Sequence, residues 1–139
     1  LYRALRVDKL TLSALETILL HYLKKEATEK IPVWKMISTP KDTLKARGEK
    51  IIQKLADKNI LLKESQSFLG GGSLPQQSLP TYVLAFNSDL SPENLSESFR
   101  KQKPPLIGRI EEEKFVIDLR TVFPEQDNLI VESIQKVLG

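Results

Sequence analysis

The chain has 139 residues, of which 40% are hydrophobic, and a net charge of +3, so it can bury one sizeable core or form one lobe of a larger protein, and it is not a disordered tail. It has no cysteine and a single histidine, His21, which excludes a disulfide framework and leaves no set of ligands for a structural zinc site. No apolar run approaches the ~18 residues that a membrane span needs, and the start lacks a secretory pattern, so we expect a soluble, cytoplasmic protein without membrane contact.

The first predicted element is a long helix from Asp8, a suitable N-cap residue, to about Lys25. Its apolar residues repeat at helical spacing, at positions 10, 12, 14, 15, 18, 19, 22 and 23. A stripe this wide implies burial on more than one side, as expected of a helix that links a small lobe to a larger domain. For His21, a helix residue with a satisfied ring is favoured over a catalytic residue.

A second helix is predicted after a short connector. Ile31-Pro32-Val33 is expected to be extended, because the residue before a proline avoids the α region. Ser38-Thr39-Pro40 then supplies a cap and a proline for a helix that runs to about Lys58. Gly48 inside this helix costs about 1 kcal/mol relative to alanine, which indicates close approach of a neighbouring backbone.

The remaining elements predict an α+β fold. Strands are expected at 60–64 and 81–86, a short helix at 90–101, a hairpin of 106–110 and 114–119 around three glutamates, and a closing helix at 127–138. Together they form an antiparallel sheet of about four strands with helices on one face. We therefore divide the chain into a linking helix, residues 1–30, and a small C-terminal α+β domain, residues 31–139.

Arg3 and Arg6 are the leading candidate site residues. Arginine carries a planar, permanently charged fork of donors that matches phosphate or carboxylate oxygens. On a helix, a spacing of three residues puts both forks on one face. From the residues alone, solvated surface charges remain the alternative.

The basic first half leaves two interpretations open. Residues 1–63 hold 14 Lys+Arg against 7 Asp+Glu, whereas residues 64–139 hold 7 against 11, so the first half is the candidate for an anionic partner such as RNA. Equally, Lys45, Lys50, Lys54 and Lys58 can form the solvated face of a helix.

A glycine run, Gly70-Gly71-Gly72-Ser73, is similar to a phosphate-binding loop. No Lys-Ser or Lys-Thr follows it, and Leu74-Pro75 prevents a helix from starting at once, so it is not a nucleoside triphosphate P-loop. A turn that needs positive φ is favoured.

Several stretches, taken in order, resemble one family. They are RALRVDKLTL at 3–12, IPV at 31–33, GGGSLP at 70–75 followed by LP, and PPLIGRIEEEKFVIDLRTV at 104–122. Their order and spacing resemble the C-terminal part of bacterial selenocysteine synthase, the L-seryl-tRNA(Sec) selenium transferase family, from Leu1 to about Val122.

The resemblance implies the small domain of a fold type I enzyme that uses pyridoxal 5'-phosphate. Such an enzyme converts seryl-tRNA(Sec) to selenocysteinyl-tRNA(Sec) with selenophosphate as selenium donor, and it assembles as a homo-oligomeric ring of dimers. Within the family, the arginines that match Arg3 and Arg6 hold the anionic donor. The resemblance also implies that the glycine run forms a wall of the active site.

The cofactor lysine is expected upstream of this chain. Asp8-Lys9-Leu10 matches the start of the family's Schiff-base stretch, DKLLGGPQ, but Thr11 breaks the match, so Lys9 is not that lysine. The chain is then expected to be a C-terminal fragment, inactive alone, with the cofactor bound mainly by the missing part.

Arg109 and Arg120 are weaker site candidates. Many fold type I enzymes use a small-domain arginine to hold a free α-carboxylate, but in seryl-tRNA that group is esterified. Salt bridges with Glu111 or Asp118 are therefore favoured for both.

Two other functions stay open. One is a related fold type I enzyme that acts on another substrate. The other is a noncatalytic basic module that binds RNA through residues 1–63.

Overall fold

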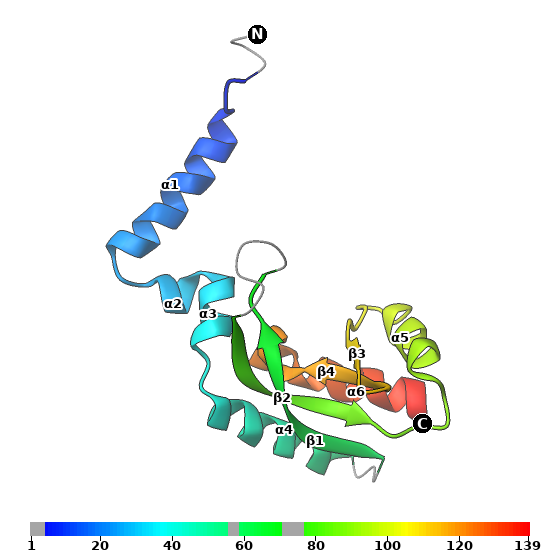
Figure 1. Cartoon of the computed structure of the whole chain (residues 1–139). Coiled ribbons are helices and arrows are strands. Elements are labelled where there is room, and N and C mark those ends of the chain that lie inside the picture. Colours follow the sequence, from blue (N-terminus) through cyan, green and yellow to red (C-terminus); the bar gives the residue numbers. More distant parts are fainter. Residues whose placement is uncertain (1–4, 56–58, 71–76) are drawn as a thin grey trace. The chain divides into compact units, whose positions relative to one another are not determined.

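The computed structural model describes residues 5–55, 59–70 and 77–139. The chain forms two compact units, Leu1–Ser38 and Thr39–Gly139. The first unit ends at Ser38, and the linking role predicted for residues 1–30 stays a prediction. Each unit is described by itself below and can be followed in Figure 1.

The first unit consists of three helices: α1 (Lys9–Leu23), α2 (Ala27–Lys30) and α3 (Pro32–Ser38). The helix predicted from Asp8 is confirmed. It ends with Lys25 in the left-handed region at φ 60°, where the Glu26 N–H donates to the His21 carbonyl oxygen over 2.9 Å. This arrangement closes the helix in the manner of a Schellman motif, with lysine at the position that usually holds glycine.

The extended connector predicted at Ile31-Pro32-Val33 is wrong beyond its first residue. Ile31 is extended, with φ −92° and ψ 118°, as expected before a proline. Pro32, however, opens α3. A proline fits the first turn of a helix because its missing N–H has no partner to lose there.

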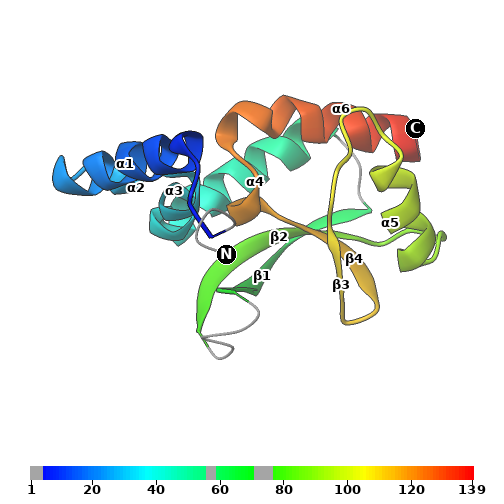
Figure 2. The ribbon, with the colours of Figure 1, turned by 90° about the horizontal axis from the view of Figure 1, so that it is seen from above.

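The second unit is an α+β domain built on one sheet. Its strands are β1 (Ile60–Phe68), β2 (Ser78–Phe86), β3 (Arg109–Glu111) and β4 (Lys114–Asp118), and its helices are α4 (Lys41–Leu55), α5 (Pro92–Arg100) and α6 (Asp127–Leu138). Two short 3-10 helices, Leu119–Thr121 and Pro124–Gln126, lie between β4 and α6. The strands pair antiparallel in the order β1-β2-β4-β3. Figure 2 shows α4 and α6 side by side over one face of the sheet, so the predicted fold class is confirmed.

The core lies between this face and the helices. It contains three phenylalanines, Phe86 from β2, Phe99 from α5 and Phe115 from β4, whose ring centroids lie 5.1–5.5 Å apart. Aromatic pairs at such distances add to the stability gained from buried area. Because successive side chains of a strand point to opposite faces of the sheet, the helices pack against every second strand residue.

Gly48 lies at the point where α4 meets the sheet. A Cβ built there would lie 2.3 Å from Leu62 Cδ1 and 3.0 Å from Leu119 Cδ1. The close approach predicted at this glycine is therefore made by leucine side chains and not by a neighbouring backbone. The end predicted for this helix, Lys58, lies outside the described residues.

The predicted hairpin is present as β3 and β4, and β1 and β2, which were predicted only as strands, also pair with each other. β1 and β2 extend past the predicted strands, because the polar residues from Ser65 to Ser67 pair as strand although they carry no apolar signal. β3 and β4 are joined by Glu112 and Glu113, which both have positive φ, 49° and 60°. Two such residues form the type I′ turn that matches the twist of a hairpin.

The described residues contain neither a membrane-spanning helix nor a cluster of metal ligands. None of their helices combines the length and apolar character that crossing a membrane requires. The same residues contain no group of three or more His, Cys, Asp or Glu side chains placed to hold a metal ion.

Candidate functional site

Arg6 lies in the exposed segment that precedes α1, and Arg3 lies outside the described residues. The helix begins only at Lys9, so the prediction that a helical face presents Arg6 is wrong. The reason is the N-cap: Asp8 has extended backbone angles, φ −73° and ψ 162°, and a cap residue ends the helix on its N-terminal side.

Asp8 caps α1 with both of its carboxylate oxygens. The Thr11 backbone N–H donates to Oδ1 over 3.0 Å, and the Thr11 hydroxyl donates to Oδ2 over 2.7 Å. The hydrogen bond from the Thr11 side chain, with the one from its backbone, lowers the pKa of Asp8. The cap was predicted from the sequence, but the second contact was not, because the Thr11 hydroxyl carries no recognisable signal.

The described part of the chain pairs no carboxylate with Arg6. Its nearest acidic neighbour in sequence, Asp8, is held by Thr11 instead. An arginine that is exposed and has no carboxylate partner can bind an anion without first breaking an ion pair.

The apolar residues of α1 have no cover within their own unit. None of the residues of α1 is buried, and Leu12, Leu15 and Leu19 are each about half exposed, at 53%, 51% and 52%. Such a concentration of exposed leucine marks an interaction surface. His21 at the end of this helix contacts the Glu26 carboxylate over 3.2 Å, as expected of a satisfied ring.

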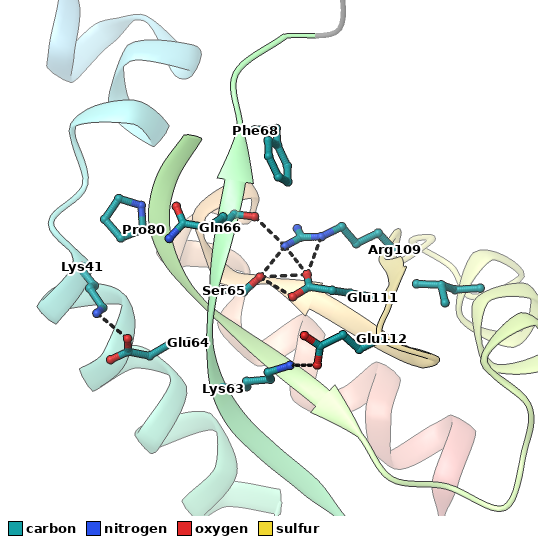
Figure 3. Close-up of a pocket in the computed structure, with 11 residues that line it drawn as sticks. Lys41, Lys63, Glu64, Ser65, Gln66, Phe68, Pro80, Arg109, Glu111 and Glu112 are labelled. Carbon is teal, nitrogen blue, oxygen red and sulfur yellow. Dashed lines mark hydrogen bonds and ion pairs between the residues drawn. The ribbon is translucent and has the colours of Figure 1, made fainter. Parts of the chain in front are cut away.

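Arg109 lies on the sheet face that the helices leave open, as Figure 3 shows. Its guanidinium donates to Asp118 Oδ2 over 2.7 Å, to Glu111 Oε2 over 2.9 Å and to the Gln66 carbonyl oxygen over 3.0 Å. The ion pairs favoured for Arg109 from the sequence are thus present. Burial opposes the charge of Arg109, but its bonds to Asp118 and Glu111 outweigh burial and raise its pKa.

Asp118 accepts hydrogen bonds from several side chains on this open face. Its side chain is 5% exposed and accepts hydrogen bonds from Ser67 over 2.6 Å, from Thr81 over 2.7 Å and from Arg109. Burial by itself would raise the pKa of Asp118, but these hydrogen bonds outweigh it and hold the pKa below its ordinary value. The carboxylate therefore ties β1, β2 and β3 to β4.

Arg120 joins the start of the second unit to the sheet. It is 6% exposed and donates to the Thr39 carbonyl oxygen over 2.9 Å and to the Pro80 carbonyl oxygen over 2.7 Å. Because these partners are backbone groups, we assign Arg120 a structural task.

A cleft of about 600 Å³ opens beside Arg109. Its three cations are each paired with a carboxylate: Lys41 with Glu64, Lys63 with Glu112, and Arg109 with Glu111. These charges compensate one another, so the cleft offers no excess positive charge to an anionic substrate. The glycine run that precedes β2 is described only at Gly70, whose φ of 69° fits the predicted turn; Gly71, Gly72 and Ser73 lie outside the described residues.

The described residues thus combine a small α+β domain, whose own charges are compensated, with a helical segment that follows an exposed arginine. Exposed leucines such as those of α1 are typical of a segment that packs against another protein surface. The comparisons with known proteins show the family to which the chain belongs.

The family model of L-seryl-tRNA selenium transferase (SelA) matches residues 1–123, and the chain belongs to this family. The chain is 42% identical to the L-seryl-tRNA(Sec) selenium transferase of Clostridium botulinum strain 657 and 41% identical to that of Carboxydothermus hydrogenoformans. Each match covers 99% of this chain and 31% of the relative. The chain therefore spans about a third of the length of these relatives and corresponds to their C-terminal part.

Proposed function

We propose that the full-length protein is a selenium transferase that converts seryl-tRNA(Sec) to selenocysteinyl-tRNA(Sec), with selenophosphate as selenium donor. The proposal rests on family membership across residues 1–123, and within that range on the segment that contains Arg3 and Arg6. Because its substrate is a tRNA, we also place the protein in the cytoplasm.

The observation that carries the site assignment is the state of Arg6. It is exposed, and no carboxylate in the described part of the chain neutralises it, unlike Arg109. An arginine keeps its charge at neutral pH and presents paired donors to phosphate oxygens. We therefore assign Arg6, with Arg3, to the phosphate end of the selenium donor and not to the tRNA.

The cofactor lysine is proposed to lie outside this chain, and the exposure of the described lysines supports that placement. A lysine that forms a Schiff base works from a sheltered pocket that lowers its pKa, whereas none of the lysines in the described ranges is buried. Lys9, at the first position of α1, is exposed. We place the cofactor and its lysine in the part of the longer relatives that this chain does not span, and we expect the chain alone to be inactive.

Assembly is the remaining part of the proposal. The uncovered leucines of α1 support contact with the rest of the protein, and the ring of dimers that the resemblance implies stays a proposal. Among the lysines for which RNA binding stayed open, Lys54 bonds to Asn128, which supports a solvated helix face at that residue over a separate RNA-binding module.

The test is the dependence of turnover on donor concentration in the full-length protein. We expect Arg6→Ala to raise the KM for selenophosphate about tenfold to a hundredfold, since a hydrogen bond to a charged group contributes about 1.5–3 kcal/mol. The KM for seryl-tRNA(Sec) should change little. Arg100→Ala, which removes an exposed arginine at the end of α5, is the matched control. An unchanged donor KM in Arg6→Ala would refute the assignment of Arg6.

A further inference from the structure

Arg6 is followed two residues later by an acid, Asp8. A carboxylate this close in sequence can weaken an anion site, because it can pair with the arginine and compete with the ligand. In the structure both Asp8 oxygens are instead occupied by Thr11, at 3.0 and 2.7 Å. The acid is thereby turned toward α1.

We propose that Asp8 and Thr11 act together as a clamp that positions Arg6 and leaves its guanidinium available to the anionic donor. This inference rests on the function proposed above for Arg6. It makes Asp8 a positioning residue, which acts on the ligand only through the arginine.

The clamp has one mechanical consequence. The two contacts fix the point at which the backbone changes from the extended angles of Asp8 to the first helical residue, Lys9. The direction in which Arg6 leaves the helix is set by that change. Without the cap, the first turn of α1 frays, and only a fraction of the protein molecules hold Arg6 in the position that binds the anion. The apparent affinity for the anion then falls by the fraction that remains competent.

The clamp also has an electrostatic consequence. The carboxylate of Asp8 is charged at neutral pH as an ordinary aspartate is, and the hydrogen bonds from Thr11 lower its pKa further. The charged carboxylate accepts hydrogen bonds from the N–H and O–H groups of Thr11 at the positive end of α1. An ordinary N-cap would stabilise the helix in the same way, so the test must separate donor binding from stability.

The experiment compares three variants of the full-length enzyme by their KM for selenophosphate and their kcat. Asp8→Ala should raise this KM about threefold to tenfold with kcat at saturating donor within about twofold, which matches the usual effect of losing a cap. Asp8→Asn should keep the KM at or below the wild-type value, because asparagine caps equally well and carries no competing charge.

Ser91→Ala is the matched control. Ser91 caps α5 through a single hydrogen bond from the Asn94 N–H, at 3.2 Å, so its loss also weakens a helix start. It should lower the melting temperature without changing the donor KM. A KM raised equally by Ser91→Ala, or an unchanged KM in Asp8→Ala beside a raised KM in Arg6→Ala, would overturn the clamp while the proposed function stands. No effect in Arg6→Ala itself would overturn both.

Discussion

Replacing Asp118 by asparagine should strongly destabilise the α+β domain. The carboxylate is almost fully buried and accepts hydrogen bonds from Ser67, Thr81 and Arg109 and from the Arg120 N–H. An amide keeps one acceptor but turns an NH₂ group toward donors. Breaking a buried pair costs about 3–5 kcal/mol; because the Arg109 side chain is 35% exposed, we expect about 2–4 kcal/mol.

The assay is urea unfolding of the 139-residue chain followed by circular dichroism. The expected loss is a large share of the ~5–15 kcal/mol by which domains are usually stable. Asp89→Asn, at an exposed aspartate, is the control and should change the free energy of unfolding by less than about 0.5 kcal/mol.

The pH dependence gives an independent check with a defined sign. The pKa of Asp118 is lower in the folded protein, so its contribution is present above its unfolded pKa of about 3.9 and is lost as the pH falls through the folded pKa. The difference between the wild type and Asp118→Asn should therefore shrink between about pH 5 and pH 2. A variant as stable as the wild type at pH 7, or a difference that grows in acid, would refute this reasoning.

Two further predictions concern packing. Gly108→Ala should destabilise the domain by about 1–3 kcal/mol in the same urea assay, because its Cβ would lie 2.4 Å from the Val116 carbonyl oxygen; a gain in stability would contradict the close packing of this loop. Replacing Leu15 and Leu19 together by glutamate should reduce self-association of the 139-residue chain in sedimentation analysis, since both are half exposed on α1. A chain that is already monomeric at high concentration would argue against self-association through this face of α1.

The sequence predicted the elements whose apolar residues repeat regularly. The helices α1, α4, α5 and α6, the strands β1 and β2 and the hairpin of β3 and β4 were predicted because periodic leucine, isoleucine and valine report the buried face directly. The outer half of β1 was missed because Ser65 and Ser67 bury their hydroxyls on distant carboxylates, Glu111 and Asp118. Pairing of that kind depends on contacts between residues far apart in the chain, which a local pattern does not contain.

The candidate site divides in the same way. The cap at Asp8 and the ion pairs of Arg109 with Glu111 and Asp118 follow from neighbours close in sequence, and both were predicted. The helical placement of Arg6 failed because the spacing rule applies only inside a helix, and the cap predicted at Asp8 already puts Arg6 ahead of that helix. The carbonyl partners of Arg120 lie 40 and 81 residues away, beyond any local signal.

The most direct test of the central claim is the fate of serine on tRNA(Sec). The full-length protein, loaded with pyridoxal phosphate, is incubated with seryl-tRNA(Sec) and selenophosphate, and the amino acid released from the tRNA is identified by mass spectrometry. Our account predicts selenocysteine, formed only when selenophosphate is present. Recovery of unchanged serine from folded, cofactor-loaded protein would contradict it.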